Sequence, residues 1–224
     1  MNARVIAAAA LLPLLCACAG GPPAPVWQEE AFAALEGYKK HYFSGDSLRA
    51  ARDLAAARAA ISSTGRLDLA ARAELFRCAI GTAALDFEVC GAIEPLLLDA
   101  DSEDRAYADF LAGRWEGLDR SALAARYRPV VEARSEQGQN QAAQQIDDPL
   151  SRIIAAGVLM KRAGISPATV AAAVEAASQE GLRRPVLAWL NVQARLAEAA
   201  GDKLALETIR RRIELVSGPP VAAQ

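Results

Sequence analysis

The sequence is poor in aromatic residues and in net charge, and each shortage excludes a class of protein. Phe, Trp and Tyr make up only 5% of the 224 residues, whereas 52 residues are alanine. This composition favours helices packed through small side chains over a β-rich core. The formal net charge is −2, which gives no strong field to attract nucleic acid or anionic lipid. We therefore expect an all-α protein that does not bind nucleic acid.

The sequence also lacks recognisable catalytic and metal-binding motifs. His41 is the only histidine, which is too few for a histidine-rich metal site, and no G-x-S-x-G or H-E-x-x-H motif surrounds it. The run DADSED at 99–104 alternates carboxylates as a calcium-binding loop does. However, Asp104 occupies the position where such a loop needs glycine, and Phe110 the position where it needs glutamate. We expect these carboxylates to cap a helix. We assign no catalytic, metal-binding or cofactor-binding residue and predict that the protein is not an enzyme.

The apolar run near the start of the sequence is too short to cross a membrane. Residues 5–15 form a run of 11 apolar residues, whereas a transmembrane helix needs roughly 20. Such a run after the basic Arg4 matches the hydrophobic region of a secretory signal. The sequence Leu15-Cys16-Ala17-Cys18 then resembles the lipobox of bacterial lipoproteins, which has an aliphatic residue at −3, a small one at −1 and the cysteine that receives the lipid.

This resemblance implies that residues 1–17 are cleaved and that Cys18 carries a fatty-acyl lipid anchor. Residues 18–26 would form a flexible tether rich in Pro and Gly. Because Ala19 rather than aspartate follows the cysteine, the resemblance also implies the periplasmic face of the outer membrane. The alternative is that Ala17-Cys18-Ala19 is an ordinary A-x-A cleavage site, which would release a soluble periplasmic protein.

In an oxidising periplasm, Cys78 and Cys90 become candidates for a disulfide. On one continuous helix they would lie about 18 Å apart, well beyond the reach of a disulfide. A turn near residue 85 would bring them to matching heights on two antiparallel helices. We therefore predict the bridge, and the alternative is two buried free thiols.

Apolar periodicity predicts helices along the first part of the chain. One covers residues 27–43, and two apolar stripes follow at helical spacing. The first stripe is Ala50, Leu54, Ala57 and Ile61, and the second is Leu67, Ala71, Leu75, Cys78, Thr82 and Leu85. Gly45 and Gly65 occupy positions typical of helix ends.

The middle of the chain is less regular. Asp101-Ser102 should cap a helix that runs to about Gly113. A second helix is predicted from Asp119 across Pro129, with the proline either kinking it or lying in its first turn. The polar segment 136–145 is interpreted as an exposed helix end or a mobile loop. Asp148-Pro149 then begins the next helix.

The last part of the chain is divided by glycines at 164, 181, 201 and 218, with a helix between each pair. Ser166-Pro167 and Pro185 begin two of these helices, and the last helix carries the stripe Leu206, Ile209, Ile213 and Val216. The stretch from Trp189 to Ile209 resembles a degenerate tetratricopeptide repeat. This resemblance implies stacked antiparallel helical hairpins over a single domain, 27–218, followed by a disordered tail, 219–224. An irregular helical bundle is the alternative.

These features predict an interaction protein of the bacterial envelope. We expect a lipid-anchored scaffold or adaptor whose helical surface binds an envelope protein partner, with no metal and no cofactor. Two alternatives stay open. One is an enzyme that hydrolyses cell wall or envelope lipid, which a cleft lined by carboxylates with shifted pKa values would favour. The other is a small-ligand binding module, for which Tyr107, Trp115 and Trp189 are the candidate aromatic contacts.

Overall fold

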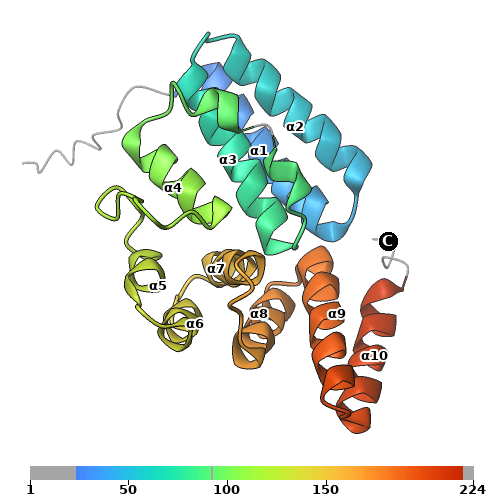
Figure 1. Cartoon of the computed structure of the whole chain (residues 1–224). Coiled ribbons are helices and arrows are strands. Elements are labelled where there is room, and N and C mark those ends of the chain that lie inside the picture. Colours follow the sequence, from blue (N-terminus) through green and yellow to red (C-terminus); the bar gives the residue numbers. More distant parts are fainter. Residues whose placement is uncertain (1–23, 92, 219–224) are drawn as a thin grey trace, which may run out of the picture.

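The computed structural model describes residues 24–91 and 93–218, and these residues form helices joined by turns, without β-strands (Figure 1). The predicted all-α class is therefore confirmed. The signal, Cys18 and the tail 219–224 lie outside the described residues. No helix in the described part is both long and apolar enough to cross a membrane. The α-helices are α1 (Val26–Ser44), α2 (Ser47–Ser62), α3 (Leu67–Ala83), α4 (Ser102–Ala112), α5 (Arg128–Glu132), α6 (Glu136–Gln144), α7 (Pro149–Lys161), α8 (Pro167–Gln179), α9 (Arg183–Ala199) and α10 (Lys203–Ser217), and two 3₁₀ helices, η1 (Glu88–Cys90) and η2 (Glu94–Leu96), lie between α3 and α4.

The helices at the start of the chain follow the predicted pattern. The buried residues of α2 are the four residues of its predicted stripe. Gly45 and Gly65 end helices with φ angles of 91° and 65°, in the left-handed region that glycine favours. Leu67 differs from the prediction, because it begins α3 and is 52% exposed.

The predicted helix caps of the middle and later segments are present. The side chains of Asp101, Asp148 and Ser166 each accept a hydrogen bond from the backbone N–H three residues later. Each of these bonds satisfies one of the unpaired donors at a helix start. Pro149 and Pro167 occupy the first helical positions of α7 and α8, where a missing N–H has no cost.

The predicted helix beginning at Asp119 is wrong. Residues 119–127 form turns, and α5 begins only at Arg128, with Pro129 in its first turn. The Asp119 carboxylate accepts hydrogen bonds from the backbone N–H groups of Ser121 and Ala122, at 2.9 and 3.3 Å. These bonds cap one turn, but the carbonyl oxygens of Ser121 and Leu123 then accept from the Arg128 guanidinium at 2.8 and 2.7 Å, and the helix does not continue.

The segment 136–145 is neither an exposed end of another helix nor a mobile loop. It forms α6, and the buried Asn140 attaches this helix to the turn before α8. The Asn140 amide donates to the carbonyl oxygen of Gly164 at 2.7 Å. Its oxygen accepts from the Ser166 N–H at 2.8 Å and from the Thr169 hydroxyl at 2.7 Å. A buried polar side chain with its hydrogen bonds satisfied therefore orders a polar segment.

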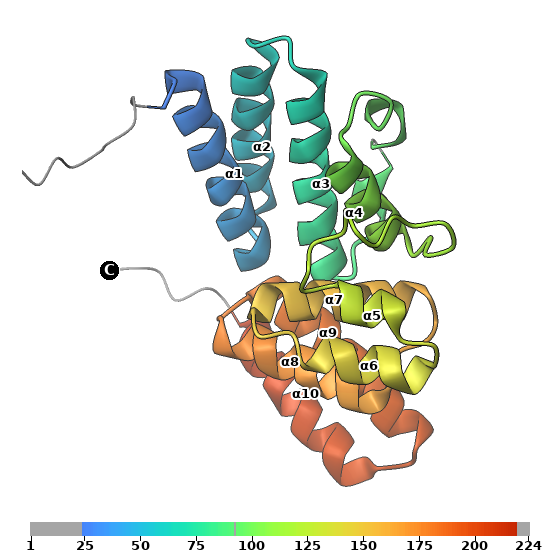
Figure 2. The ribbon, with the colours of Figure 1, turned by 90° about the vertical axis from the view of Figure 1, so that its left-hand side faces the viewer.

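The last four helices form the antiparallel pairs α7–α8 and α9–α10 (Figure 2). Helix α9 begins at Arg183, two residues before the predicted Pro185. Gly181 and Gly201 have φ angles of 64° and 69° and end helices as expected. Before α8, however, Ala163 and not Gly164 takes the left-handed conformation, with φ of 59°.

Helices that are distant in sequence also pack together. Helix α1 contacts α9, and α3 crosses α7, so the first three helices lie on the later ones (Figures 1 and 2). The Trp189 side chain of α9 is fully buried, and its Nε1–H donates to the carbonyl oxygen of Ala83 at 2.9 Å. One continuous apolar core therefore runs from α1 to α10.

Candidate functional site

The two cysteines predicted to pair are brought together. The Sγ atoms of Cys78 and Cys90 lie 2.00 Å apart. The chain reverses through Leu85, whose φ is 59°, and returns through the short helix η1 and not through the second long helix that we expected. Gly81 permits this tight return, because a Cβ there would lie 2.7 Å from the carbonyl oxygen of Asp86. The predicted lipid acceptor, Cys18, lies outside the described residues.

The remaining residues singled out in the sequence have structural partners. His41 Nδ1 lies 2.6 Å from Asp53 Oδ2. Arg72 pairs with Asp101 at 2.9 Å and with Asp104 at 3.1 Å, which ties α3 to the start of α4. No group of three or more potential metal ligands occurs in residues 24–91 and 93–218.

The candidate binding surface with the most aromatic lining is a groove that we name the α3–α7 groove. It lies between α3, α4, the 119–127 connection and α7, and its cavity has a volume of about 380 Å³. Apolar and aromatic side chains form most of its surface, with four charged groups among them. The lining residues are Arg72, Leu75, Phe76, Ala79, Ile80, Asp104, Tyr107, Ala124, Arg126, Tyr127, Asp148, Leu150, Ser151 and Ile154.

Stacked aromatic rings make one wall of the groove rigid. The ring of Tyr127 stacks on Phe110 with centroids 4.5 Å apart and on Tyr107 with centroids 5.8 Å apart. Burial raises the pKa of both tyrosines, that of Tyr107 far above its ordinary value, so both hydroxyls keep their protons. The wall thus presents neutral aromatic surface to a bound segment.

Two carboxyl groups in the groove have pKa values shifted in opposite directions. Burial raises the pKa of Asp104, and the neighbouring Arg72 only partly offsets this effect. Burial acts on Asp148 in the same sense, but hydrogen bonds from the side chain and backbone of Ser151 outweigh it and lower the Asp148 pKa. The two groups therefore differ in proton affinity within one groove.

Arg126 connects the groove to a second hollow. This hollow has a volume of about 390 Å³, and Arg126 and Asp148 line both cavities. The Arg126 side chain donates to the Ser151 hydroxyl at 3.2 Å, and within residues 24–91 and 93–218 it forms no ion pair. An exposed guanidinium thus lines two adjacent open hollows.

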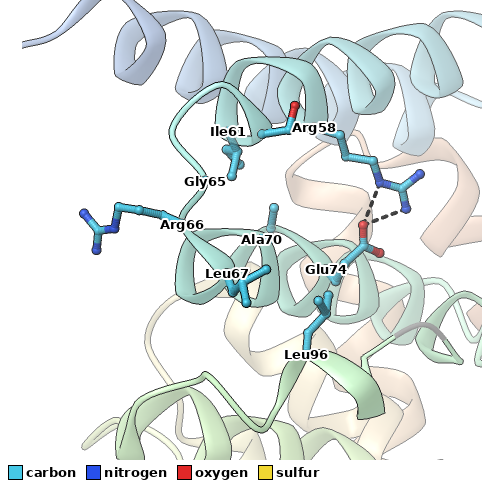
Figure 3. A pocket seen from close by; sticks show the side chains of 10 residues that line it. Arg58, Ile61, Gly65, Arg66, Leu67, Ala70, Glu74 and Leu96 are labelled. Carbon is cyan, nitrogen blue, oxygen red and sulfur yellow. Dashed lines mark hydrogen bonds and ion pairs between the residues drawn. The ribbon is translucent and has the colours of Figure 1, made fainter.

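A separate pocket of about 330 Å³ lies at the turn between α2 and α3 (Figure 3). Its interior is mostly apolar, with Ile61, Leu67 and Leu96 among its lining residues. The buried Glu74 carboxylate at its edge is held by Arg58 and Arg77, each at 2.7 Å through Nε. The charge of Glu74 is therefore already compensated inside the protein.

The three aromatic residues considered as ligand contacts have different surroundings. Trp189 lies in the core, and Trp115 is buried with the Arg162 guanidinium 4.0 Å above its ring. Only Tyr107 lines the α3–α7 groove. No sequence pattern marks Arg126 or Asp148 as groove residues, because the groove assembles from segments far apart along the chain.

Comparison with protein-family models, with curated proteins and with solved structures finds no match to this chain. The all-α class and the geometry of these pockets are therefore the starting point for assigning a function.

Proposed function

We propose that this protein is a lipid-anchored adaptor of the bacterial envelope and that its α3–α7 groove binds an extended segment of a protein partner. The lipid on Cys18 confines the domain to the membrane surface, which raises its effective concentration near membrane-bound partners. The groove then supplies the specificity of the interaction.

The observation that carries the proposal is that two open hollows lie side by side and share Arg126 and Asp148 as lining residues. Adjacent open hollows suit an extended segment that places one side chain in each. An extended peptide fits such a surface better than a small ligand, which binds best in an enclosed pocket.

The chemistry of the groove defines the kind of segment it would bind. Its aromatic wall at Tyr107 and Tyr127 suits an apolar or aromatic side chain. Arg126 lies beside that wall and suits a carboxylate, which a guanidinium can bind through two parallel hydrogen bonds. We therefore propose a partner segment in which an apolar residue lies next to an acidic side chain or a terminal carboxylate.

Site-specific photo-crosslinking in living cells tests this proposal. A photoreactive amino acid replaces Ala124, an exposed residue of the groove, and in the control protein it replaces Ala56, an exposed residue of α2. We expect one envelope protein to be captured from position 124 and not from position 56. Arg126→Glu should abolish this capture without changing protein level. Equal capture from both positions, or capture that Arg126→Glu leaves unchanged, would contradict the groove as the binding site.

The opposite pKa shifts of Asp104 and Asp148 favour one second candidate, an envelope hydrolase. Both residues, however, have structural roles, since Asp104 pairs with Arg72 and Asp148 caps α7. We therefore rank the hydrolase below the adaptor. Release of soluble fragments from purified cell wall, lost in Asp104→Asn and in Asp148→Asn, would reverse this order.

A further inference from the structure

One end of the helical domain is formed by three segments that are separate in sequence. They are the start of α1 at Val26, the α2–α3 turn (residues 63–66) and the 97–101 connection before α4. Ala31 of α1 packs in a small apolar cluster with Ile61 and Ala73, which joins the first two segments to α3. The ion pair between Arg72 and Asp101 adds the start of α4. We name this region the tether end, because the described residues begin here at Ala24, just before α1 (Figure 2).

The tether end exposes large apolar side chains from all three of its segments. Val26 is 70% exposed and Leu98 is 86% exposed, and Leu67 beside the α2–α3 turn is half exposed. The apolar pocket of Figure 3 opens between the last two segments, and Leu67 and Leu96 both line it. Exposed apolar groups gathered around a pocket are characteristic of a contact surface.

The length of the tether identifies what this surface contacts. Only five residues separate Cys18 from Ala24, the first described residue, so the six steps from one to the other span at most about 20 Å when fully extended. This step rests on the proposed function, because a lipid on Cys18 is what fixes that residue at the membrane. With that anchor, Ala24 lies within about 20 Å of the lipid headgroups, and α1 begins two residues later.

We propose that the tether end docks on the membrane surface, with Leu67 and Leu98 in the interfacial layer of the bilayer. Side chains of this kind bind an interface by burying apolar area at the boundary between headgroups and acyl chains. The α9–α10 turn lies at the opposite end of the molecule and points away from the membrane in this orientation (Figures 1 and 2).

The charges around the tether end define the type of lipid surface. Exposed carboxylates outnumber exposed cations on and next to these segments. The acidic residues are Glu29, Glu30, Asp99, Asp101 and Glu103, and the basic residues are Arg66, Arg72 and Arg105. An anionic bilayer repels such a surface within a Debye length. The docking therefore depends on apolar contact and favours zwitterionic lipid.

Fluorescence quenching by brominated lipid tests the proposed docking. The full-length lipidated protein is reconstituted in phosphatidylcholine vesicles whose acyl chains carry bromine, and Trp27→Phe removes the tryptophan nearest the tether. Leu98→Trp then places a probe at the tether end. Leu204→Trp is the matched control, since Leu204 is 75% exposed and lies two residues after the α9–α10 turn. The buried Trp115 and Trp189 contribute the same background to both proteins.

We expect quenching to be at least about threefold stronger for Leu98→Trp than for Leu204→Trp, because an interfacial side chain lies about 5–10 Å into the bilayer boundary. Adding Leu67→Glu to the Leu98→Trp protein should reduce its quenching towards the value of the Leu204→Trp control. Replacing part of the phosphatidylcholine with anionic phosphatidylglycerol at low salt should also reduce it, because the acidic surface is then repelled.

Two negative results have different meanings. Flotation of the vesicles on a density gradient shows whether the protein is anchored to them. If the protein floats with the vesicles but quenching is equal at both positions, the protein is anchored and not docked. This result overturns the inference and leaves the lipid anchor in place. A protein that does not float with the vesicles lacks the anchor, which overturns the docking together with the anchored part of the proposed function.

Discussion

The substitution Gly157→Ala tests how closely α3 and α7 pack. Gly157 lies on α7 where this helix crosses α3, and a Cβ at this position would lie 2.3 Å from the carbonyl oxygen of Thr82 and 2.8 Å from its Cγ2. The nearest atom belongs to the backbone, so it cannot move aside as a flexible side chain would. The two helices must therefore separate to admit a single methyl group.

Two opposing effects determine how much Gly157→Ala changes the free energy of unfolding. Alanine stabilises a helix interior by roughly 0.5–1 kcal/mol relative to glycine. Overpacking a well-packed core typically costs about 1–3 kcal/mol. Since the contact is a backbone contact well inside van der Waals distance, we expect overpacking to dominate and the free energy of unfolding to fall by about 2 kcal/mol.

Urea denaturation followed by circular dichroism measures this loss. Gly164→Ala is the matched control, because a Cβ there would meet its nearest neighbour, Glu136, at an ordinary distance of 3.8 Å. We expect the control to change the free energy of unfolding by less than about 1 kcal/mol. Adding Thr82→Ser to Gly157→Ala should recover part of the loss, since it removes Cγ2 but leaves the carbonyl. If Gly157→Ala were as stable as the control, the close contact between α3 and α7 would be refuted.

Three further substitutions test other parts of the structure. Asn140→Ala should lower the free energy of unfolding in urea by about 2 kcal/mol, because it removes the hydrogen bonds to the backbone of the turn before α8 and to the buried Thr169. An unchanged free energy of unfolding would contradict the role of Asn140. Replacing Cys78 and Cys90 together by alanine should lower the free energy of unfolding by around 3 kcal/mol in the chain-entropy model. In the oxidised wild-type protein, alkylation followed by mass spectrometry should find no free thiol at these two positions. Because folding raises the pKa of Asp104 above its ordinary 3.8, its ionised form opposes folding. The wild-type protein should therefore lose stability relative to Asp104→Asn as pH rises from 3.8 through the raised pKa, and a parallel pH profile of the two proteins would argue against this effect.

The helices of this protein are predictable where local signals agree. The stripe from Ala50 to Ile61 is the buried face of α2, since a long apolar period and two flanking glycines specify the same helix. The caps at Asp101, Asp148 and Ser166 could also be predicted, because a cap depends on residues within one turn.

Two errors in the middle of the chain come from polar side chains whose partners the sequence does not reveal. The Arg128 guanidinium bonds to the carbonyl oxygens of Ser121 and Leu123, which a helix beginning at Asp119 would use for its own backbone bonds. Asn140 does the opposite, since bonds to residues more than 20 positions away order a helix that its polar composition argues against. The α3–α7 groove was not predictable for the same reason. Its charged residues, Arg72, Asp104, Arg126 and Asp148, come from four separate segments.

The contact between α1 and α9 has a consequence for how this protein can evolve. In an open array of repeats, a hairpin can be duplicated or deleted because each unit touches only its neighbours. Here the first helix contacts the ninth, and Trp189 of α9 bonds to the end of α3, so the number of helices between them is fixed by geometry. Gain or loss of a whole hairpin would separate these partners. We therefore expect homologous proteins to differ in loop length and surface residues while keeping the same number of helices from α1 to α9.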